Sequence, residues 1–386
     1  MIGPANRLND IGEYYFSRKM QEIAKLRSQG ADVINLGIGS PDFFPPRAAV
    51  DKVVEEIMKP SSHGYASYRS IPELRGAMAS WLKRHYQVAA SSEDEILPLL
   101  GSKEGIAFIT LAFVNPGDQV LVPNPGYPAY SSAVRLAGGE VIEFPLCAEK
   151  SWQPDWQELN KMDLSRVKMM WVNYPNMPTG QRPSSELFSK LVEFGRRHQI
   201  LICHDNPYSL VRNGEKPMSL LQFDSDKQGV LELHSLSKVY NMAGWRVGFV
   251  VGSRSVIDCI AKVKTNIDSG MFLPIQFGAI EALQASDQWV AAQNEIYDHR
   301  NQLVEKLFLA LGFSVEEKQE GLFVWAKAPD HIAQVEEFLD EILYKQHVFL
   351  TPGFIFGSQG RRYARASLCV SEDKIEKAIG RLKGFV

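Results

Sequence analysis

A lysine flanked by hydroxyl side chains is the most informative chemical feature of the sequence. The string Ser235-Leu236-Ser237-Lys238 follows the apolar run 230–233, and Arg246 comes eight residues after the lysine. A lysine amine can form an imine with an aldehyde, and hydroxyl and guanidinium groups together can hold a phosphate. These residues therefore suit an aldehyde cofactor that carries a phosphate, such as pyridoxal phosphate.

Two other interpretations of Lys238 start from the same residues. A lysine in a polar loop is ordinarily a solvated surface charge. The spacing also matches the Ser-x-x-Lys motif of serine acyl-enzymes, which occurs together with Ser-Asp-Asn and Lys-Thr-Gly motifs. Neither companion motif is present, and the nearest string, Lys264-Thr265-Asn266, lacks the glycine. The serine acyl-enzyme interpretation is therefore disfavoured.

An acid and a phenol follow another apolar strand. Residues 200–203 are apolar, and His204-Asp205-Asn206-Pro207-Tyr208 come next, with Asp205 33 residues before Lys238. In open α/β sheets, ligands bind outside the carboxyl ends of the strands. Pyridoxal chemistry needs a carboxylate against the pyridine nitrogen and a phenol beside the 3-oxygen of the ring. Asp205 and Tyr208 could fill these roles; the alternative is a turn-capping aspartate with a structural tyrosine.

Two further segments could contact the same kind of cofactor. Gly101-Ser102-Lys103-Glu104-Gly105 precedes a helical pattern over 106–114, and small residues at a helix start expose backbone N–H groups to an anion. This composition is common at helix starts and falls short of a complete phosphate-loop motif. Tyr127, in the turn-rich stretch 124–130, could stack on an aromatic cofactor or fill the base of its own loop.

The surrounding sequence predicts an α/β protein. Between about residues 97 and 252, short apolar runs alternate with longer helical stretches, which indicates a mainly parallel sheet covered by helices on both faces. After helical spacing to about residue 312, strands are expected at 313–315, 321–326, 348–351 and 363–366, and helices at 332–344 and 372–382. We expect a large domain over 46–285, a smaller α+β domain over 286–386, and an N-terminal segment, 1–45, that joins the smaller domain.

Composition and charge argue against several classes of protein. The chain has 386 residues, 45% of them hydrophobic, and a formal net charge of -3. It has no apolar stretch near the ~18–20 residues that span a bilayer, and no basic cluster for nucleic acid. No secretory signal is recognisable, the four cysteines form no Cys-x-x-Cys pair, and His204 has no second ligand at metal spacing. We expect a cytoplasmic protein with reduced thiols, small ligands and no metal.

In this order and at these intervals, the motifs resemble those of the class I/II aminotransferases, pyridoxal-phosphate enzymes of fold type I. The resemblance runs from Asn-Leu-Gly-Ile-Gly-Ser-Pro-Asp-Phe at 35–43 to Tyr-Ala-Arg-Ala-Ser at 363–367. It implies a large domain with a mainly parallel seven-stranded sheet between helices, and a smaller α+β domain. It also implies that the cofactor is pyridoxal 5'-phosphate and that the substrates are amino acids and 2-oxo acids.

The resemblance implies roles for individual residues. Lys238 would form the internal aldimine, Asp205 would pair with the pyridine nitrogen, and Tyr208 would contact the 3-oxygen. Arg365 would bind the α-carboxylate of the substrate through its guanidinium fork, with a backbone contact from Gly39. Tyr127 would stack on the ring. The phosphate would be held by Ser102 and Lys103 through their backbone amides and by Ser235 and Arg246, and Ser237 would also contact the cofactor.

Tyr65 matches a family tyrosine that reaches the phosphate in the partner subunit. The resemblance therefore implies a homodimer whose two active sites are shared between the chains. Ser70, shortly after it, occupies a position where the family more often has glycine, before Ile-Pro-Glu-Leu-Arg. We expect this to be a tolerated change in a turn.

Met177 is a second departure from the family pattern. The family's Asn-Pro-Thr-Gly turn is Met177-Pro178-Thr179-Gly180 here, so the asparagine that hydrogen-bonds the 3-oxygen is replaced by a residue that cannot donate. Unless Asn173 or Asn176 contacts the cofactor instead, Tyr208 remains the side-chain donor to that oxygen. The pKa of the aldimine is then expected to be higher than the family norm.

Three function classes compete. The leading expectation is an aminotransferase that moves the amino group of an L-amino acid to a 2-oxo acid by a ping-pong mechanism. A β-eliminating carbon–sulfur lyase on the same scaffold is the alternative, and a catalytically silent binding protein is the third.

The amino-acid specificity is less determined. Aspartate-type relatives carry an arginine for a distal carboxylate in the stretch that corresponds to 266–276, and this stretch contains none. Its residues 267–272, Ile-Asp-Ser-Gly-Met-Phe, are similar to a subgroup that includes LL-diaminopimelate aminotransferases, in which case Asp268 could meet a distal ammonium.

Overall fold

The main body of the protein is built on one large sheet. The computed structural model describes residues 2–9, 11–12 and 15–385. The sheet has seven strands in the order β2-β8-β7-β6-β5-β3-β4. These strands are β2 (Ile96–Leu99), β3 (Gln119–Asn124), β4 (Glu140–Pro145), β5 (Val167–Val172), β6 (Leu201–Asp205), β7 (Val230–Ser235) and β8 (Gly248–Val251). Within the described chain, β8 alone runs opposite to the others, so the mainly parallel sheet of an α/β protein is confirmed.

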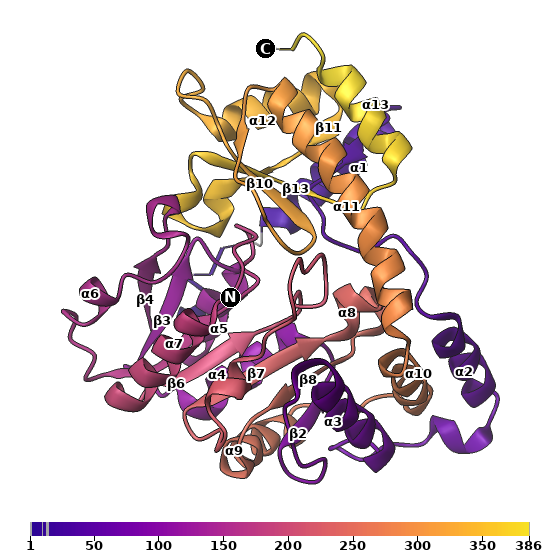
Figure 1. Cartoon of the computed structure of the whole chain (residues 1–386), viewed down its shortest axis with the longest axis vertical. Coiled ribbons are helices and arrows are strands. Elements are labelled where there is room, and N and C mark those ends of the chain that lie inside the picture. The colour runs from indigo at the N-terminus through magenta and orange to yellow at the C-terminus, as the bar shows by residue number, and fades with distance from the viewer. Residues whose placement is uncertain (1, 10, 13–14, 386) are drawn as a thin grey trace.

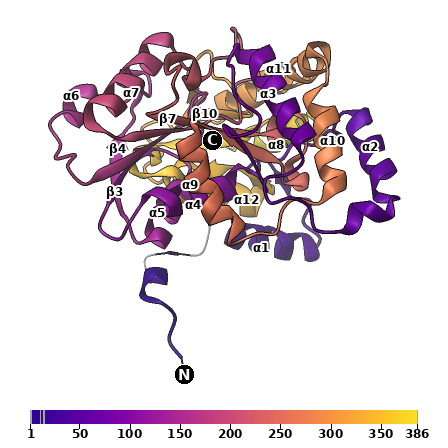
Figure 2. The same ribbon diagram turned by 90° about the horizontal axis from the view of Figure 1, so that it is seen from below.

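Helices cover both faces of this sheet (Figure 1). They are α2 (Arg47–Ile57), α3 (Pro72–Tyr86), α4 (Ser102–Phe113), α5 (Pro128–Ala137), α6 (Trp156–Leu159), α7 (Ser185–His198), α8 (Leu236–Val239), α9 (Arg254–Thr265) and α10 (Leu273–Leu283). Buried residues of α4, α5 and α9, such as Ile106 and Ile260, pack with alternate strand residues on one face. Those of α3, α7 and α10 pack on the other, and α2 lies against α10 at one side of the body (Figure 2).

Local sequence explains why several of these helices begin and end where they do. Ser184 precedes α7, and its hydroxyl accepts a hydrogen bond from the backbone N–H of Leu187 at 3.1 Å. This bond satisfies one of the donors that every helix leaves unpaired in its first turn. At the other end, Gln199 adopts the left-handed conformation that terminates a helix. Between them, Leu187, Phe188 and Leu191 form the buried stripe that holds α7 on the sheet.

The C-terminal part forms a second layer of structure above the large sheet (Figure 1). Its antiparallel sheet has the order β12-β13-β10-β9, and α11 runs up into it from the main body. The elements are α11 (Asp287–Ala310), β9 (Ser314–Val315), β10 (Phe323–Lys327), α12 (Val335–Gln346), β11 (Val348–Phe349), β12 (Thr351–Pro352), β13 (Tyr363–Ser367) and α13 (Glu372–Leu382). The strand predicted over 348–351 is divided, because β11 and β12 belong to different sheets.

The N-terminal segment packs on this C-terminal part. β1 (Ile34–Asn35) pairs in parallel with β11. In α1 (Tyr15–Ser28), the Lys19 ammonium lies 3.0 Å from the carboxylate of Asp340 on α12. The domain boundaries at residues 45 and 285 remain predictions. Among the helices described, none combines the length and the hydropathy needed to cross a bilayer.

The sheet brings residues from four strands to a single edge. β2, β5, β6 and β7 point the same way, so the residues at or after their carboxyl ends meet: Ser102, Asn173, Asp205 and Ser235. Because β8 runs in the opposite direction, its preceding residue Arg246 reaches the same edge from the amino end of the strand. This is the edge at which open α/β sheets bind ligands.

Candidate active site

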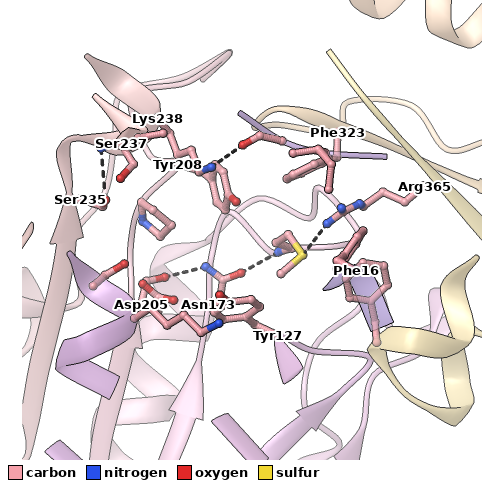
Figure 3. A pocket seen from close by; sticks show the side chains of 18 of the residues that line it. Phe16, Tyr127, Asn173, Asp205, Tyr208, Ser235, Ser237, Lys238, Phe323 and Arg365 are labelled. Atoms are coloured by element: carbon pink, nitrogen blue, oxygen red, sulfur yellow. Dashed lines mark hydrogen bonds between the residues drawn. The ribbon is translucent and has the colours of Figure 1, made fainter. Parts of the chain in front are cut away.

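A cavity of about 500 Å³ lies where this edge faces β10 and β13. The volume is in the range that small-molecule sites occupy. Of the fourteen residues predicted for the site, twelve line the cavity (Figure 3). They are Gly39, Ser102, Lys103, Tyr127, Asn173, Asp205, Tyr208, Ser235, Ser237, Lys238, Arg246 and Arg365.

The other two predicted residues lie outside the cavity. Asn176 is buried in the turn after β5, where its amide oxygen accepts from the Thr179 hydroxyl at 2.8 Å and its amide nitrogen donates to the Asn173 carbonyl at 3.1 Å. Tyr65 is 96% exposed on the surface of its own chain. A residue that serves a second copy of the chain would be exposed in this way.

Lys238 lies in the short helix that follows β7. Ser235 caps this helix, since its hydroxyl accepts from the Ser237 N–H at 3.2 Å, and the Lys238 ammonium donates to the carbonyl of Gly39. Burial lowers the pKa of Lys238, and the positive charges of Arg365 and Arg246 lower it further. A lowered pKa makes the neutral, nucleophilic amine easier to form.

Gly39 is required by the close approach of its segment to β10. A Cβ atom at this position would lie 2.2 Å from Cζ of Phe323, which is far inside van der Waals contact. The backbone of residue 39 can therefore reach the cavity only without a side chain.

Asp205 ends β6 as a buried carboxyl group with one oxygen paired and one unpaired. Its Oδ2 accepts from the Tyr130 hydroxyl at 2.8 Å, whereas its Oδ1 is buried and has no hydrogen-bond partner among the described residues. Burial raises the pKa of Asp205 to about 6, against the opposing effects of the Tyr130 hydrogen bond and the charge of His204. A buried acceptor without a partner is costly, so this oxygen suits a cationic donor such as a protonated ring nitrogen.

Tyr130 is a site residue that the sequence reasoning missed. Its ring stacks on Trp171 with centroids 5.0 Å apart and meets the ring of Tyr127 edge-on at 5.6 Å. Burial raises the pKa of Tyr130 well above its usual value, and the carboxylate of Asp205 adds to this effect, so the phenol stays a donor. Tyr130 follows Tyr127 by three residues at the start of α5, and this helical spacing was the available signal.

The part of the cavity beside the first turn of α4 suits a phosphate. Gly101 precedes α4 with φ of +90°, and a Cβ atom there would lie 2.1 Å from Nη2 of Arg246. The glycine thus allows the guanidinium to lie beside the exposed N–H groups of the first turn of α4. Together with the hydroxyl groups of Ser102, Ser235 and Ser237 in the lining, these donors form an anion site.

Arg365, from β13, lies on the side of the cavity that faces the N-terminal segment. Its Nη2 donates to the Gly37 carbonyl at 2.9 Å, and its Nη1 lies 3.1 Å from the Met177 sulfur. The guanidinium stacks on the ring of Phe323, with 3.8 Å to the centroid. A thioether is a weak acceptor, so a carboxylate could displace it from the guanidinium.

The two asparagines near Met177 are engaged within the protein. Asn173 donates from its amide nitrogen to the backbone oxygen of Asp205 at 2.6 Å, and its amide oxygen accepts from the N–H of Met177 at 2.7 Å. The amide of Asn176 is used inside the turn. Asn176 therefore does not reach the cofactor site, whereas Asn173 lines the cavity and donates only one of the two hydrogens of its amide nitrogen in its bond to Asp205.

A buried network of charged side chains contacts the turn that follows β5. Nδ1 of His204 lies 2.7 Å from a carboxylate oxygen of Glu232, and its Nε2 lies 2.9 Å from the carbonyl oxygen of Tyr174. The backbone N–H of Tyr174 also donates to Nε2, at 3.3 Å. Burial alone would raise the pKa of Glu232, but the charges and hydrogen bonds of His204 and His234 hold it far below its usual range.

These features fit pyridoxal phosphate at three separate points. The unpaired oxygen of Asp205 suits the ring nitrogen, the amine of Lys238 suits the aldehyde, and the site around α4 and Arg246 suits the phosphate. Tyr127 and Tyr208 also line the cavity. The fit uses side chains from β6, β7, α4 and α8, together with Arg246 from the segment before β8.

Comparisons with known proteins agree with this site. The family model described as aminotransferase class I and II matches residues 31–382. The LL-diaminopimelate aminotransferase of Halothermothrix orenii is 38% identical over 380 residues, which cover 98% of this chain and 97% of that protein. The enzyme of the same name from Nitratidesulfovibrio vulgaris is 39% identical, with 98% of each chain covered.

Solved structures give the same result for the fold. Apo-BacF from Bacillus subtilis has a TM-score of 0.95 at 34% identity, covering 100% of this chain and 98% of that one. The aspartate aminotransferase of Thermus thermophilus with maleate has a TM-score of 0.92 at 26% identity, covering 100% of both chains. The resemblance seen in the motifs is thereby confirmed, and a β-eliminating lyase is not favoured. The chain belongs to the class I and II aminotransferases, and it transfers amino groups with pyridoxal phosphate.

Proposed function

We propose that Lys238, Asp205, Tyr208 and Arg365 carry out the transfer of an amino group from an L-amino acid to a 2-oxo acid. The observation that supports this most directly is the convergence on one cavity of a buried amine, an unpaired carboxylate oxygen and a guanidinium. When bound, pyridoxal phosphate supplies an electron sink for the charge that develops at the α-carbon of the substrate. Side chains of the protein orient the substrate and move the protons.

Arg365 orients the amino acid, because its guanidinium binds the α-carboxylate and replaces the weak contact to Met177. Lys238 then takes the proton from the α-carbon as a general base, a role favoured by its lowered pKa. Asp205 holds the proton on the ring nitrogen through Oδ1, and Tyr130 fixes the carboxylate through Oδ2. Tyr208, which lines the cavity, would donate to the 3-oxygen of the bound cofactor.

We further propose that the chain acts as a homodimer in the cytoplasm. Exposed apolar side chains, among them Val54, Met58, Tyr65, Tyr68 and Phe272, lie on segments that a second copy would cover. In that arrangement Tyr65 contacts the phosphate in the site of the partner subunit. The four cysteines are unpaired thiols in the structure, which suits a reducing compartment.

The assignment of Lys238 is tested by chemical trapping. Borohydride reduction of the cofactor-loaded protein, followed by peptide mapping, should place the reduced adduct on Lys238. Lys238→Ala should lower turnover at least about 100-fold, because both the amine linkage and the general base are lost. Lys306→Ala, an exposed lysine on α11, should leave turnover unchanged.

An adduct on another residue, or turnover retained in Lys238→Ala, would refute the assignment. The products distinguish the remaining function classes. A transaminase converts its cofactor to the amine form with an amino acid alone, a lyase releases pyruvate and ammonia, and a silent protein shows no spectral change. LL-diaminopimelate, the substrate in the names of several relatives, is one candidate donor for this assay.

A further inference from the structure

Aromatic side chains surround the guanidinium of Arg365. Its Cζ lies 3.8 Å from the ring centroid of Phe323, 4.6 Å from that of Phe356 and 5.7 Å from that of Phe16. Phe16 and Phe323 lie on different sides of the guanidinium (Figure 3). A substrate whose α-carboxylate binds Arg365 and whose amine reaches Lys238 therefore has its side chain beside these rings. Ile38, which also lines the cavity, adds another apolar surface.

The charged groups of the cavity already have roles under the proposed function. Lys238 and Asp205 serve the reaction, Lys103 and Arg246 lie at the phosphate end, and Arg365 holds the α-carboxylate. Among the described residues that line the cavity, no other lysine, arginine, aspartate or glutamate is present. The described part of the chain therefore places no further charge in the cavity lining to bind a carboxylate or an ammonium at the far end of a substrate side chain.

A second copy of the chain would add mainly aromatic and apolar side chains from its two exposed loops. The side chains exposed on residues 65–68 and 267–272 include Tyr65, Tyr68, Ile267 and Phe272, which are aromatic or apolar. The one charged residue in these two stretches is Asp268.

Asp268 is held by its own chain. Its Oδ1 accepts from the Lys264 ammonium at 2.8 Å and from the N–H of Gly270 at 2.8 Å. Its Oδ2 is buried and has no hydrogen-bond partner among the described residues, and the side chain is only 10% exposed. The neighbouring Arg69 donates to the Asp258 carboxylate at 2.6 Å. The expectation that Asp268 meets a distal ammonium stays a prediction, and Asp268 does not line the cavity of its own chain.

We propose that the amino donor is an L-amino acid with an uncharged, apolar side chain, aromatic or large and aliphatic, and that Phe16 and Phe323 contact this side chain. The proposal rests on the function proposed above and names its substrate class. A second charge buried beside these rings without a partner would be strongly unfavourable, whereas an apolar side chain gains free energy from leaving water. This class differs from the diamino dicarboxylate in the names of the relatives.

The first experiment measures the half-reaction of the cofactor-loaded enzyme without any 2-oxo acid, followed by the loss of cofactor absorbance. L-phenylalanine and L-leucine should react at least about 100-fold faster, per unit concentration, than LL-diaminopimelate, L-aspartate, L-glutamate and L-lysine. Equal or faster reaction of any of these charged amino acids would overturn the proposal while leaving the aminotransferase function intact. Failure of every amino acid to react would instead count against the proposed function.

The second experiment measures binding, which does not depend on turnover. 3-Phenylpropanoate has a carboxylate and a ring but no amine, and calorimetry on the loaded enzyme should show it binding at least about 10-fold more tightly than glutarate. Phe16→Ala should weaken binding of 3-phenylpropanoate about 10-fold and leave that of propanoate nearly unchanged. Leu309→Ala, an exposed apolar residue on α11, should change neither.

Tighter binding of glutarate than of 3-phenylpropanoate would overturn the substrate class. Unchanged affinity in a folded Phe16→Ala variant would remove Phe16 from the substrate contacts. Should Phe16→Ala fail to fold, the two affinities of the wild-type enzyme still decide the substrate class, and Phe16→Leu tests the ring itself.

Discussion

At the scale of single residues, Asp205 combines a charge with surroundings that disfavour it. Burial raises the pKa of its carboxyl group from 3.8 to about 6. The group therefore contributes stability at low pH, which the cofactor-free protein loses as the pH rises from about 4 through about 6. At neutral pH the ionised carboxylate destabilises the folded state by on the order of 1–3 kcal/mol.

We expect Asp205→Asn to stabilise the cofactor-free protein at pH 7 to 8 by that amount, because the amide has no charge to bury. Thermal unfolding at a series of pH values checks this, and the difference from wild type should fade as the pH falls to about 4. In the loaded protein the order should reverse, since wild type alone gains the ion pair with the ring nitrogen. A difference that is constant across this pH range would contradict the account.

The identity of residue 177 should affect the pH at which the Lys238-bound cofactor changes its protonation. The wild-type residue cannot donate to the 3-oxygen, and Asn176 is engaged inside the turn. Met177→Asn restores a donor that stabilises the oxygen in its anionic form. We expect the midpoint of the pH titration of cofactor absorbance to fall by about one pH unit, which corresponds to one hydrogen bond to a charged group. Identical midpoints in the two proteins would defeat the idea.

At the scale of elements, the turn before α3 contains a serine in the left-handed backbone conformation that favours glycine. Ser70 is buried and has φ of +64°, and its carbonyl accepts from Nη1 of Arg75 at 2.7 Å. Left-handed backbone costs an L-residue roughly 1–2 kcal/mol, and glycine avoids most of this cost while gaining some freedom in the unfolded chain.

Ser70→Gly should therefore raise the free energy of unfolding by about 0.5–1 kcal/mol, measured by urea denaturation. Ser80→Gly, on the exposed face of α3, is the matched control and should lower it by about 0.5–1 kcal/mol, because glycine is a poor helix former. Destabilisation by both substitutions would show that the turn is not strained.

At the scale of the whole molecule, the proposed dimer predicts complementation between inactive chains. A site would take Lys238 from one chain and Tyr65 from the other. Mixing Lys238→Ala with Tyr65→Ala, after subunit exchange, should restore up to about a quarter of wild-type activity, since half the dimers are hybrids and each has one intact site.

A mixture of Lys238→Ala and Asp205→Ala provides the control. Both residues line one cavity of one chain, so neither site of that hybrid is intact and no recovery is expected. Absence of recovery with Tyr65→Ala, in hybrids shown to form by mass spectrometry, would mean that the sites are not shared.

Much of the catalytic centre was predictable from the sequence, for a physical reason. Lys238, Asp205 and Asn173 each follow a short apolar strand, and parallel strands end at the same edge of a sheet. Local patterns thus predicted that these residues meet, although 33 residues separate Asp205 from Lys238. The divided strand at 348–351 could not be predicted, because β11 pairs with β1 at the other end of the chain, whereas β12 pairs with the nearby β13 in a different sheet.

Tertiary structure alone decided what surrounds those residues. Phe16, Phe323, Phe356 and Arg365 come from separate elements and meet around one guanidinium, and no periodic pattern links their positions. The structure likewise commits Asn173 to the backbone of Asp205. Periodicity records which face of an element is buried, whereas the partner of a side chain depends on how distant elements pack. The sequence therefore indicated the chemistry, and the packing decided which substrate that chemistry can reach.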